Sequence, residues 1–549
     1  MRLLIFLSLP LLGLFSCQSR QSVDLLVRNG HIYTMESEGA SVEAMVIDQG
    51  RILALGTEAD LIDRFDADST IDLKGKTVLP GFIDAHCHFP AYARSLLTAD
   101  LRGARSESEM VRLLKSWYDE QVERGREMRR IDGWGGDQTD WPEREMPTRA
   151  SLDSVFPDIP VVLRRVDGHA VLVNTSALEE YEVSGQEVAG GEIVLKSGSP
   201  TGLLIDNAAD LIAPARLDSA LMHSALLQAE KNCFQKGLTG LNDAGLGPDE
   251  WQPLRRMLAR RELQMPIYCM AADDSSNYHF LNVHGPVSDD RFWLESVKFY
   301  ADGALGSRGA LLLEPYHDAH DHFGLPVRTA VYLQTHYKRM RELGLQVCTH
   351  AIGDSANRIV LQLYGEVISE LEDHRWRIEH AQVVAEEDWP LFREYQVLPS
   401  MQPTHATSDA DWAEDRLGES RMVRAYAYSS LEEQLGLIPL GTDFPIEDID
   451  PLKTFYAAVA RKDFTGEPKT GFRIEEALSR WKALKGMTYD AAFAQFREDE
   501  VGRLVPGSWA NWVLWDTDLL NCHEDSIPFA QVEMTVLRGE KVYENNNPR

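Results

Sequence analysis

The sequence predicts an α/β fold: a (β/α)8 barrel of the TIM type, a small β-sandwich domain built from both termini, and a large insertion after the first barrel strand. Eight short apolar runs have the character of buried parallel strands, helical periodicity lies between several of them, and both chain ends are rich in strand and turn signals. The eight runs occupy residues 77–83, 238–242, 267–271, 296–300, 345–349, 376–378, 396–401 and 437–440.

The composition indicates a globular chain and excludes two classes of partner. The 549 residues are 44% hydrophobic and 26% charged, which is near the globular average and excludes disorder, collagen and coiled coil. Lys and Arg number 55 against 86 Asp and Glu, a net charge of −31. Nucleic acids and anionic membrane surfaces are bound through basic fields, so neither is an expected partner.

The N-terminus resembles an export signal. Arg2 precedes the largely apolar residues 3–15, a run shorter than the ~20 residues that a membrane-spanning helix needs. We therefore expect residues 1–16 to be a signal peptide. Ser16-Cys17 resembles the lipobox of bacterial lipoproteins, which implies a lipid on Cys17 and an exported protein anchored in the cell envelope or periplasm by that lipid alone. A plain signal peptide with an incidental cysteine is the alternative.

The segments that follow are typical of a small sheet domain. Asn29-Gly30 comes after an apolar run and is a hairpin signal, and Gln49-Gly50 is a weaker one. Because the two ends of a domain often lie close together, we expect one composite β-sandwich domain. Its residues would be 22–78 and 500–545, with strands at 24–27, 44–47, 51–56, 510–515 and 534–543.

Residues 79–499 are expected to form the barrel. Helical periodicity at residues 220–236 and 355–371 would supply crossover helices. About 150 residues separate the first two strands, far more than an ordinary connection. We interpret residues from about 92 to 215 as an insertion over the barrel mouth, with strands at 161–166 and 191–195. Trp134 and Trp141 are expected to pack inside it, and an aromatic wall for an apolar substrate is the alternative.

The strongest chemical signal is a His-x-His pair at the end of the first barrel strand. Side chains at i and i+2 share one face of a strand, so His86 and His88 project together while Cys87 points away. Two imidazoles at the carboxyl end of a barrel strand make half of a metal site. The pattern alone is weak, because structural histidines are common.

Polar residues recur at the ends of other barrel strands. Lys298, His350, His380 and Asp443 each lie in or directly after an apolar run, where an unpaired polar group would be costly to bury. Histidines satisfied by the backbone would explain any one of these positions. They explain poorly why such residues occur at the ends of five strands.

Together these segments resemble the amidohydrolase superfamily, family 3, in the branch of N-substituted formamide deformylase-like hydrolases. The resemblance covers nearly the whole chain after the leader. The matching blocks are residues 79–88, 297–308, 349–354, 377–382 and 441–445, with residues 147–149 and 167–169 of the insertion.

The resemblance implies a ligand set. His86, His88 and Asp443 would hold one divalent metal, and Lys298, N6-carboxylated by carbon dioxide, would bridge to a second ion held by His350 and His380. Zinc suits such ligands best, and manganese, iron and nickel are alternatives. Asp443 would also act as general base. Whether one ion or two bind, and whether Lys298 stays an amine, is left open.

The resemblance also implies residues around the ligand set. The substrate-binding candidates are His169, Asp302, Arg308, Gln402 and His405, with Asp409 close behind. Each is equally compatible with loop hydrogen bonding. Asp84 shares the face of His86 and is expected to support a metal ligand.

The leading hypothesis is a metal-dependent hydrolase of a non-peptide C–N bond, acting on an N-acyl, N-formyl or related small-molecule amide through metal-activated water. Two alternatives remain: a mononuclear aminohydrolase that deaminates a heterocycle, and a non-catalytic ligand-binding lipoprotein. The substrate, any disulfide and a homodimer state are not determined by the sequence.

Overall fold

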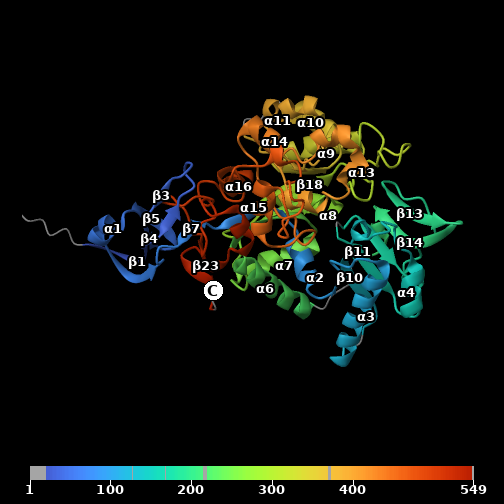
Figure 1. The fold of residues 1–549 in the computed structure, drawn as a ribbon, viewed down its shortest axis with the longest axis horizontal. Coiled ribbons are helices and arrows are strands. Elements are labelled where there is room, and N and C mark those ends of the chain that lie inside the picture. The colour runs from blue at the N-terminus through green and yellow to red at the C-terminus, as the bar shows by residue number, and fades with distance from the viewer. Residues whose placement is uncertain (1–19, 127, 167, 214–218, 369–372, 547–549) are drawn as a thin grey trace, which may run out of the picture.

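Three parts follow one another across the computed structural model, which describes residues 20–126, 128–166, 168–213, 219–368 and 373–546. Figure 1 shows the small β domain at one end, the barrel in the middle and the insertion at the other end. The expected signal peptide and Cys17 lie outside the described residues. Among the described helices, none is both long and apolar enough to span a bilayer.

A parallel sheet forms the barrel wall, and the predicted fold class is confirmed. Seven strands follow one another in the sheet, each parallel to the next. They are β8 (Phe82–Cys87), β15 (Leu238–Leu246), β16 (Ile267–Ala272), β18 (Phe292–Tyr300), β19 (Gln346–Ala351), β20 (Arg377–His380) and β21 (Leu398–Ser400). A short strand, β17 (Val287–Ser288), pairs with β18 from outside.

The eighth position is closed by an irregular segment where a strand was expected. Leu440 makes an isolated parallel bridge to Met401, and its carbonyl accepts the backbone N–H of Ala85 in β8. The backbone N–H of Asp443 then donates to the carbonyl of His86 over 2.8 Å. Residues 437–440 therefore complete the barrel through single hydrogen bonds to both neighbours, and they place Asp443 beside His86.

The expected first strand, residues 77–83, is two strands in two sheets. β7 (Thr77–Pro80) pairs with the small domain, whereas β8 pairs with β15 of the barrel. Gly81 separates them, and a Cβ there would lie 2.3 Å from the Thr239 hydroxyl. The chain can change sheets at this point because glycine lets it pass close to β15.

Helices cover the outside of the barrel between its strands (Figure 1). Several begin at side-chain caps: Asp274 accepts the N–H groups of Ser276 and Asn277, and Thr329 accepts that of Tyr332. The expected helix at 220–236 is α6 (Ser219–Gln235), and most of the one at 355–371 is α10 (Asp354–Ile368). The others include α7 (Pro248–Ala259), α8 (Ser275–His284), α9 (Ala330–Glu342), α11 (Trp389–Glu394), α14 (Tyr428–Leu435), α15 (Pro451–Ala460), α16 (Arg480–Gly486) and α17 (Tyr489–Ala494).

The small domain packs two sheets that draw on both ends of the chain. One sheet has the order β5-β4-β1-β6 and the other β24-β23-β22-β7-β2-β3. Met45 and Ile47 of the first sheet share a buried cluster with Val78, Trp512 and Val536 of the second. The strands are β1 (Gln21–Arg28), β2 (His31–Tyr33), β3 (Ser41–Val42), β4 (Ala44–Asp48), β5 (Arg51–Gly56), β6 (Phe65–Asp72), β22 (Trp512–Trp515), β23 (Val532–Leu537) and β24 (Glu540–Glu544).

Of the two turn signals in this domain, only the weaker one forms a hairpin. Asn29-Gly30 does not close a hairpin, because β1 and β2 lie in different sheets. Gln49-Gly50, the weaker signal, joins the antiparallel strands β4 and β5. Gly50 has φ +76°, and a Cβ there would lie 2.6 Å from the carbonyl oxygen of Arg538. A dipeptide signal fixes the local turn but not the sheet in which the chain continues.

The insertion carries a third, mixed sheet of order β13-β14-β12-β11-β10-β9. Its strands are β9 (Ala99–Asp100), β10 (Ile131–Gly136), β11 (Val161–Arg165), β12 (Ala170–Val173), β13 (Gly191–Lys196) and β14 (Ser199–Asp206), flanked by α3 (Glu107–Glu123), α4 (Arg149–Val155) and α5 (Thr175–Glu180). Trp141 packs in its core, as expected, and its indole N–H donates to the carbonyl of Ala104.

Candidate metal centre and active site

His86, His88 and Asp443 converge on one point at the carboxyl end of the barrel. The Oδ1 atom of Asp443 lies 3.2 Å from Nε2 of His88 and 3.6 Å from Nε2 of His86. Two ligand atoms bound tetrahedrally to one zinc ion at about 2.1 Å would lie ~3.4 Å apart. Asp443 Oδ1 is buried and makes no hydrogen bond among the described residues. The three side chains therefore have the spacing of metal ligands.

Close packing of β8 against the segment before Asp443 sets this geometry. Asp84 Oδ1 accepts the backbone N–H groups of His86 and Thr442, and its Oδ2 accepts the Thr442 hydroxyl over 2.7 Å. A Cβ on Gly441 would meet His86 N at 2.5 Å. Asp84 thus ties together the backbones that carry two ligands, in keeping with the supporting role expected for it.

A second group of potential ligands includes His405, which sequence reasoning had placed among the substrate contacts. His380, His405 and Asp443 each offer one ligand atom within 4.8 Å of the others. His405 Nε2 lies 3.1 Å from Asp443 Oδ2, and its Nδ1 lies 3.1 Å from Glu447 Oε1. Burial opposes charge on Asp443, but the hydrogen bond from His405 helps to hold the pKa of this carboxyl well below its usual range.

His350 and His380 lie side by side, with ring centroids 4.7 Å apart. His380 is fixed through Nδ1, which lies 2.7 Å from Gln402 Oε1. His350 Nε2 is buried and makes no hydrogen bond among the described residues. Burial lowers the pKa of both imidazoles well below its usual range. Both rings are therefore neutral near pH 7, the state in which a histidine binds a metal.

Lys298 is buried at the same place, on β18. Its Nζ lies 3.2 Å from His86 Nε2, and its side chain is against the ring of Tyr300. Burial lowers the pKa of the Lys298 ammonium. The structure thus brings all six predicted ligand residues to one end of the barrel.

Sequence reasoning missed Glu379, which fixes the ring of His86. Glu379 Oε2 lies 2.5 Å from His86 Nδ1, and Glu379 Oε1 lies 2.8 Å from Arg377 Nε. All three side chains are fully buried. Burial alone would raise the pKa of Glu379, but Arg377 and His86 lower it. The available signal was a pair of opposite charges at i and i+2, which share one face of a strand.

A cavity of about 950 Å³ opens above these side chains, between the barrel and the insertion. Lys298, His350, His380 and Asp443 line it from the barrel, while His169 and Asp206 line it from the insertion. Trp134 also lines the cavity, in agreement with the alternative that it is an aromatic wall. A cavity of this size and position is a natural active site for a barrel.

Three expected substrate contacts are absent from the described lining of this cavity. Gln402 is buried and bonded to His380 and to the carbonyl of Ser400. Arg308 makes a two-pronged ion pair with Asp318. Asp302 is fully buried and accepts backbone N–H groups of Leu311, Ile352 and Gly353, so that it organises loops.

His169 and Asp206 form a pair that the insertion presents to the metal centre. His169 Nδ1 lies 2.8 Å from Asp206 Oδ1, and the His169 ring centroid lies 5.3 Å from that of His350. Asp206 is packed so closely that a Cβ on Gly303 would lie 2.8 Å from its carboxylate oxygens. His169 is thereby held at the cavity wall beside the candidate ligands.

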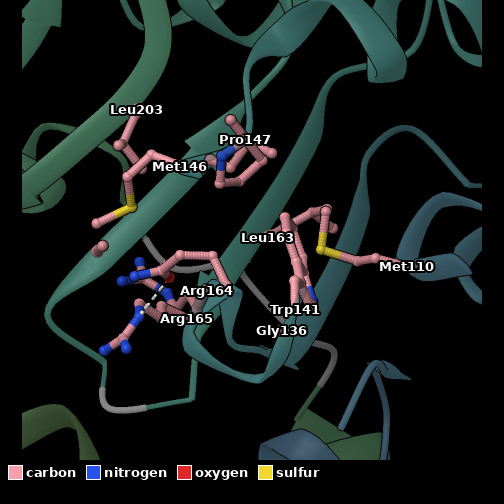
Figure 2. Close-up of a pocket in the computed structure, with 12 residues that line it drawn as sticks. Met110, Gly136, Trp141, Met146, Pro147, Leu163, Arg164, Arg165 and Leu203 are labelled. Atoms are coloured by element: carbon pink, nitrogen blue, oxygen red, sulfur yellow. Dashed lines mark hydrogen bonds between the residues drawn. The ribbon is translucent and has the colours of Figure 1, made fainter. Parts of the chain in front are cut away.

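A second, much smaller pocket lies inside the insertion (Figure 2), with a volume of about 30 Å³. Figure 2 shows Met146 and Leu203 on one side of it, Met110 and Trp141 on the other. Arg165 lines both hollows, and its Nη2 binds both carboxylate oxygens of Asp137. This volume holds only a few waters, so the larger cavity is the site for a substrate.

A barrel with convergent imidazole and carboxylate ligands at its carboxyl end defines the class of metal-dependent hydrolases. The amidohydrolase family model matches residues 69–543, and the chain belongs to this family. It is 33% identical to the protein LONG AFTER FAR-RED 3 of Arabidopsis thaliana, over 95% of this chain and 91% of that protein. An uncharacterized metal-dependent hydrolase from Pyrococcus horikoshii OT3 is 28% identical, with a TM-score of 0.75 over 91% of this chain and 99% of that one.

Two further likenesses concern the activity. The N-substituted formamide deformylase of Arthrobacter pascens is 26% identical over 95% of this chain and 99% of its own length. Four deaminases match only 12–14% of this chain. Family membership identifies a metal-dependent hydrolase acting on C–N bonds, while the sequence likeness to these four deaminases is confined to a small part of the chain.

Proposed function

We propose that this protein hydrolyses a non-peptide C–N bond in a small-molecule amide of the N-acyl or N-formyl type. The observation on which the proposal rests most is the convergence of His86 with His88 and Asp443, of which the last two line the large cavity. Near-complete coverage of the formamide deformylase supports the amide class over heterocycle deamination.

The donor set fits a divalent metal. Asp443 Oδ1 and His350 Nε2 are buried polar atoms without a hydrogen bond among the described residues, and such atoms are costly unless a ligand satisfies them. We propose His86, His88 and Asp443 as one ligand set, with zinc as the ion because it suits imidazole and carboxylate. A bound ion of this kind supplies Lewis acidity and lowers the pKa of water.

The chain's own residues would then perform the proton transfers. Asp443 is placed to take a proton from the attacking water and to deliver it to the leaving nitrogen. His169 stands on the opposite wall, beside His350, where it can donate a hydrogen bond to the substrate. Trp134 lines the same cavity and helps to exclude water from the bond that breaks.

The chemical state of Lys298, amine or carbamate, determines whether the site holds one ion or two. Its lowered pKa favours the neutral amine, which is the form that reacts with carbon dioxide to give a carbamate. A carbamate would offer two oxygens and could bridge to a second ion held by His350 and His380. If Lys298 remains an amine, it offers no bridging oxygens, and the site holds a single ion.

Metal analysis and a substrate panel test the proposal. Plasma emission spectrometry of the purified chain should find one or two divalent ions, and formamides and N-acyl amines should be hydrolysed before chelation but not after it. Ammonia released from aminoheterocycles would instead favour a deaminase. A metal-loaded chain inert toward the whole panel would favour a ligand-binding protein.

We also propose export of this chain as a lipoprotein, anchored through Cys17 after removal of residues 1–16. The apolar run and the Ser16-Cys17 pair support this location. Mass spectrometry of the mature N-terminus tests it: a diacylglyceryl group on Cys17 is the expected result, and an unmodified residue 17 would contradict it.

A further inference from the structure

The walls of the large cavity carry more carboxylates than cations. Apart from Asp443 and Lys298, eight Asp or Glu residues and four Arg or Lys residues line it. The excess persists if His169 and His405 are both counted as cations. It belongs to the cavity that most of the proposed metal ligands line, and a substrate that reaches those ligands must enter it.

Each of the four cations is already paired with a carboxylate of the same cavity. On the insertion side, Arg102 binds both oxygens of Asp100, at 2.9 and 2.7 Å, and Arg165 binds both oxygens of Asp137. On the barrel side, Arg328 Nε donates to Asp273 over 2.9 Å. There too, Lys453 Nζ donates to Asp448 over 2.7 Å.

The remaining four carboxylates have no Arg or Lys partner among the described residues. Asp206 is paired with His169, Glu447 with His405, and Asp409 accepts from Tyr426 and Gln382. Asp210 makes neither a hydrogen bond nor an ion pair with any described residue, although Arg164 and Arg328 are close enough to influence it. Asp210 is exposed, and it lines the cavity from the insertion.

A substrate with its own carboxylate would meet an unfavourable field here. It would find no Arg or Lys of the described lining that is not already committed, and it would meet the unpartnered carboxylate of Asp210. A substrate with an ammonium group would gain a partner in Asp210 and would be attracted by the cavity as a whole.

We infer that the amine part of the substrate is neutral or cationic, never anionic, and that Asp210 is the residue that recognises a cationic group. This inference rests on the proposed function and refines it, because it separates N-acyl amines and diamines from N-acyl amino acids. Arg165 and Trp134 then form part of the cavity wall. Asp210 is the residue of the insertion that distinguishes substrates by charge.

Three matched amides test the inference. N-Formyl or N-acetyl derivatives of butylamine, 1,3-diaminopropane and 4-aminobutanoate all carry three methylene groups after the amide nitrogen and differ only in the end group, which is CH3, NH3⁺ or COO⁻. With the metal-loaded full chain, kcat/KM for the anionic member should be at least ~10-fold below that of the neutral one, and the cationic member should equal or exceed it. Raising the ionic strength from about 0.05 to about 0.5 M should narrow the gap. Equal or faster turnover of the anionic member would overturn the inference.

A charge-removing variant locates the effect. Asp210→Asn should lower the ratio of cationic to neutral kcat/KM by ~3-fold, the value of an exposed ion pair. Asp63→Asn removes the same charge from an exposed position on α1 (Glu58–Arg64) of the small domain and should keep the wild-type ratio. If both variants keep it, Asp210 is not the recognising residue.

If none of the three amides is hydrolysed, the result counts against the proposed function but not against the inference about charge. Binding then tests the charge preference of the cavity directly. Equilibrium dialysis of the metal-free chain against 1,4-diaminobutane and against butanedioate avoids carboxylate coordination to the metal. Tighter binding of the diammonium ion supports the inference, and tighter binding of the dicarboxylate overturns it.

Discussion

Asp206 holds His169 by a hydrogen bond to its Nδ1 atom over 2.8 Å, with the Asp206 side chain almost wholly buried and the imidazole facing the cavity. The Asp206 carboxylate is almost unexposed at the cavity wall, so we expect it to act through the ring. The pair resembles the carboxylate–histidine arrangements that fix ring orientation in metal sites. It comes entirely from the insertion.

This pair predicts coupled effects. Asp206→Ala and His169→Ala should each lower kcat/KM by about 10–100-fold, and the double variant should be no worse than His169→Ala, because Asp206 acts only through His169. Steady-state kinetics with the best amide of the panel measures the cycle. Losses that simply multiply would mean that Asp206 has an independent role.

Glu379 predicts a loss of metal affinity from outside the ligand set. Glu379→Gln replaces the carboxylate that fixes His86 Nδ1 and leaves Arg377 buried without its ion pair, so we expect ~10–100-fold weaker metal binding together with a lower melting temperature. Asp490→Asn is the matched control, since Asp490 is equally buried but pairs with Lys485 away from the cavity. Asp490→Asn should lower stability and keep its metal. If both variants lose their metal, the effect of Glu379→Gln is one of general stability and not of ring positioning.

His86→Ala should abolish metal binding and activity together, because it removes one of three convergent ligands. His374→Ala removes another buried imidazole, one that bonds to Tyr395 and Trp376 and does not line the cavity. It should lower stability but leave the metal content intact. Normal metal and full activity in His86→Ala would refute the assignment of β8 as a ligand strand.

Lys298→Ala distinguishes the one-ion site from the two-ion site. If a carbamate on Lys298 bridges two ions, the variant should bind one ion fewer, and added formate, acetate or propionate should restore activity by replacing the bridge. Metal content and rate as a function of carboxylate concentration measure both effects. Unchanged stoichiometry without rescue would establish that Lys298 is an amine and bridges no second ion.

Gly441 predicts a backbone effect on the same site. In Gly441→Ala the new Cβ would press on His86 N at 2.5 Å and on Asp84 Oδ1 at 2.7 Å, so β8 and the Asp443 segment must separate. We expect a loss of about 1–3 kcal/mol in the free energy of unfolding and weaker metal binding. Gly247→Ala, whose Cβ would find its nearest neighbour at 4.0 Å, should change neither in a denaturation and metal-titration experiment.

Much of the barrel could be predicted because buried parallel strands are continuous apolar runs, and six of the eight coincide with observed strands. The run at 77–83 misled because hydrophobicity does not say which sheet a residue joins; only Gly81 marks the change. Residues 437–440 form no ladder, since they close the barrel through isolated bonds.

Strand ends predicted the ligand positions but not where the neighbouring loop side chains point. Lys298, His350 and Asp443 face the cavity because the carboxyl ends of barrel strands meet there. Asp302 follows a strand just as closely, yet its oxygens turn to backbone N–H groups of later loops. Those partners are more than 8 residues away in sequence, so no local pattern could identify them.

The sheet that unites both ends of the polypeptide also imposes an order on its assembly. β7, near residue 80, borders β2 on one side and β22 on the other, and β22 begins at Trp512. During synthesis the ribosome must release nearly the entire chain before that gap can be filled. One edge of β7 therefore stays unpaired until β22 has been synthesised. The barrel can fold before the small β domain is complete.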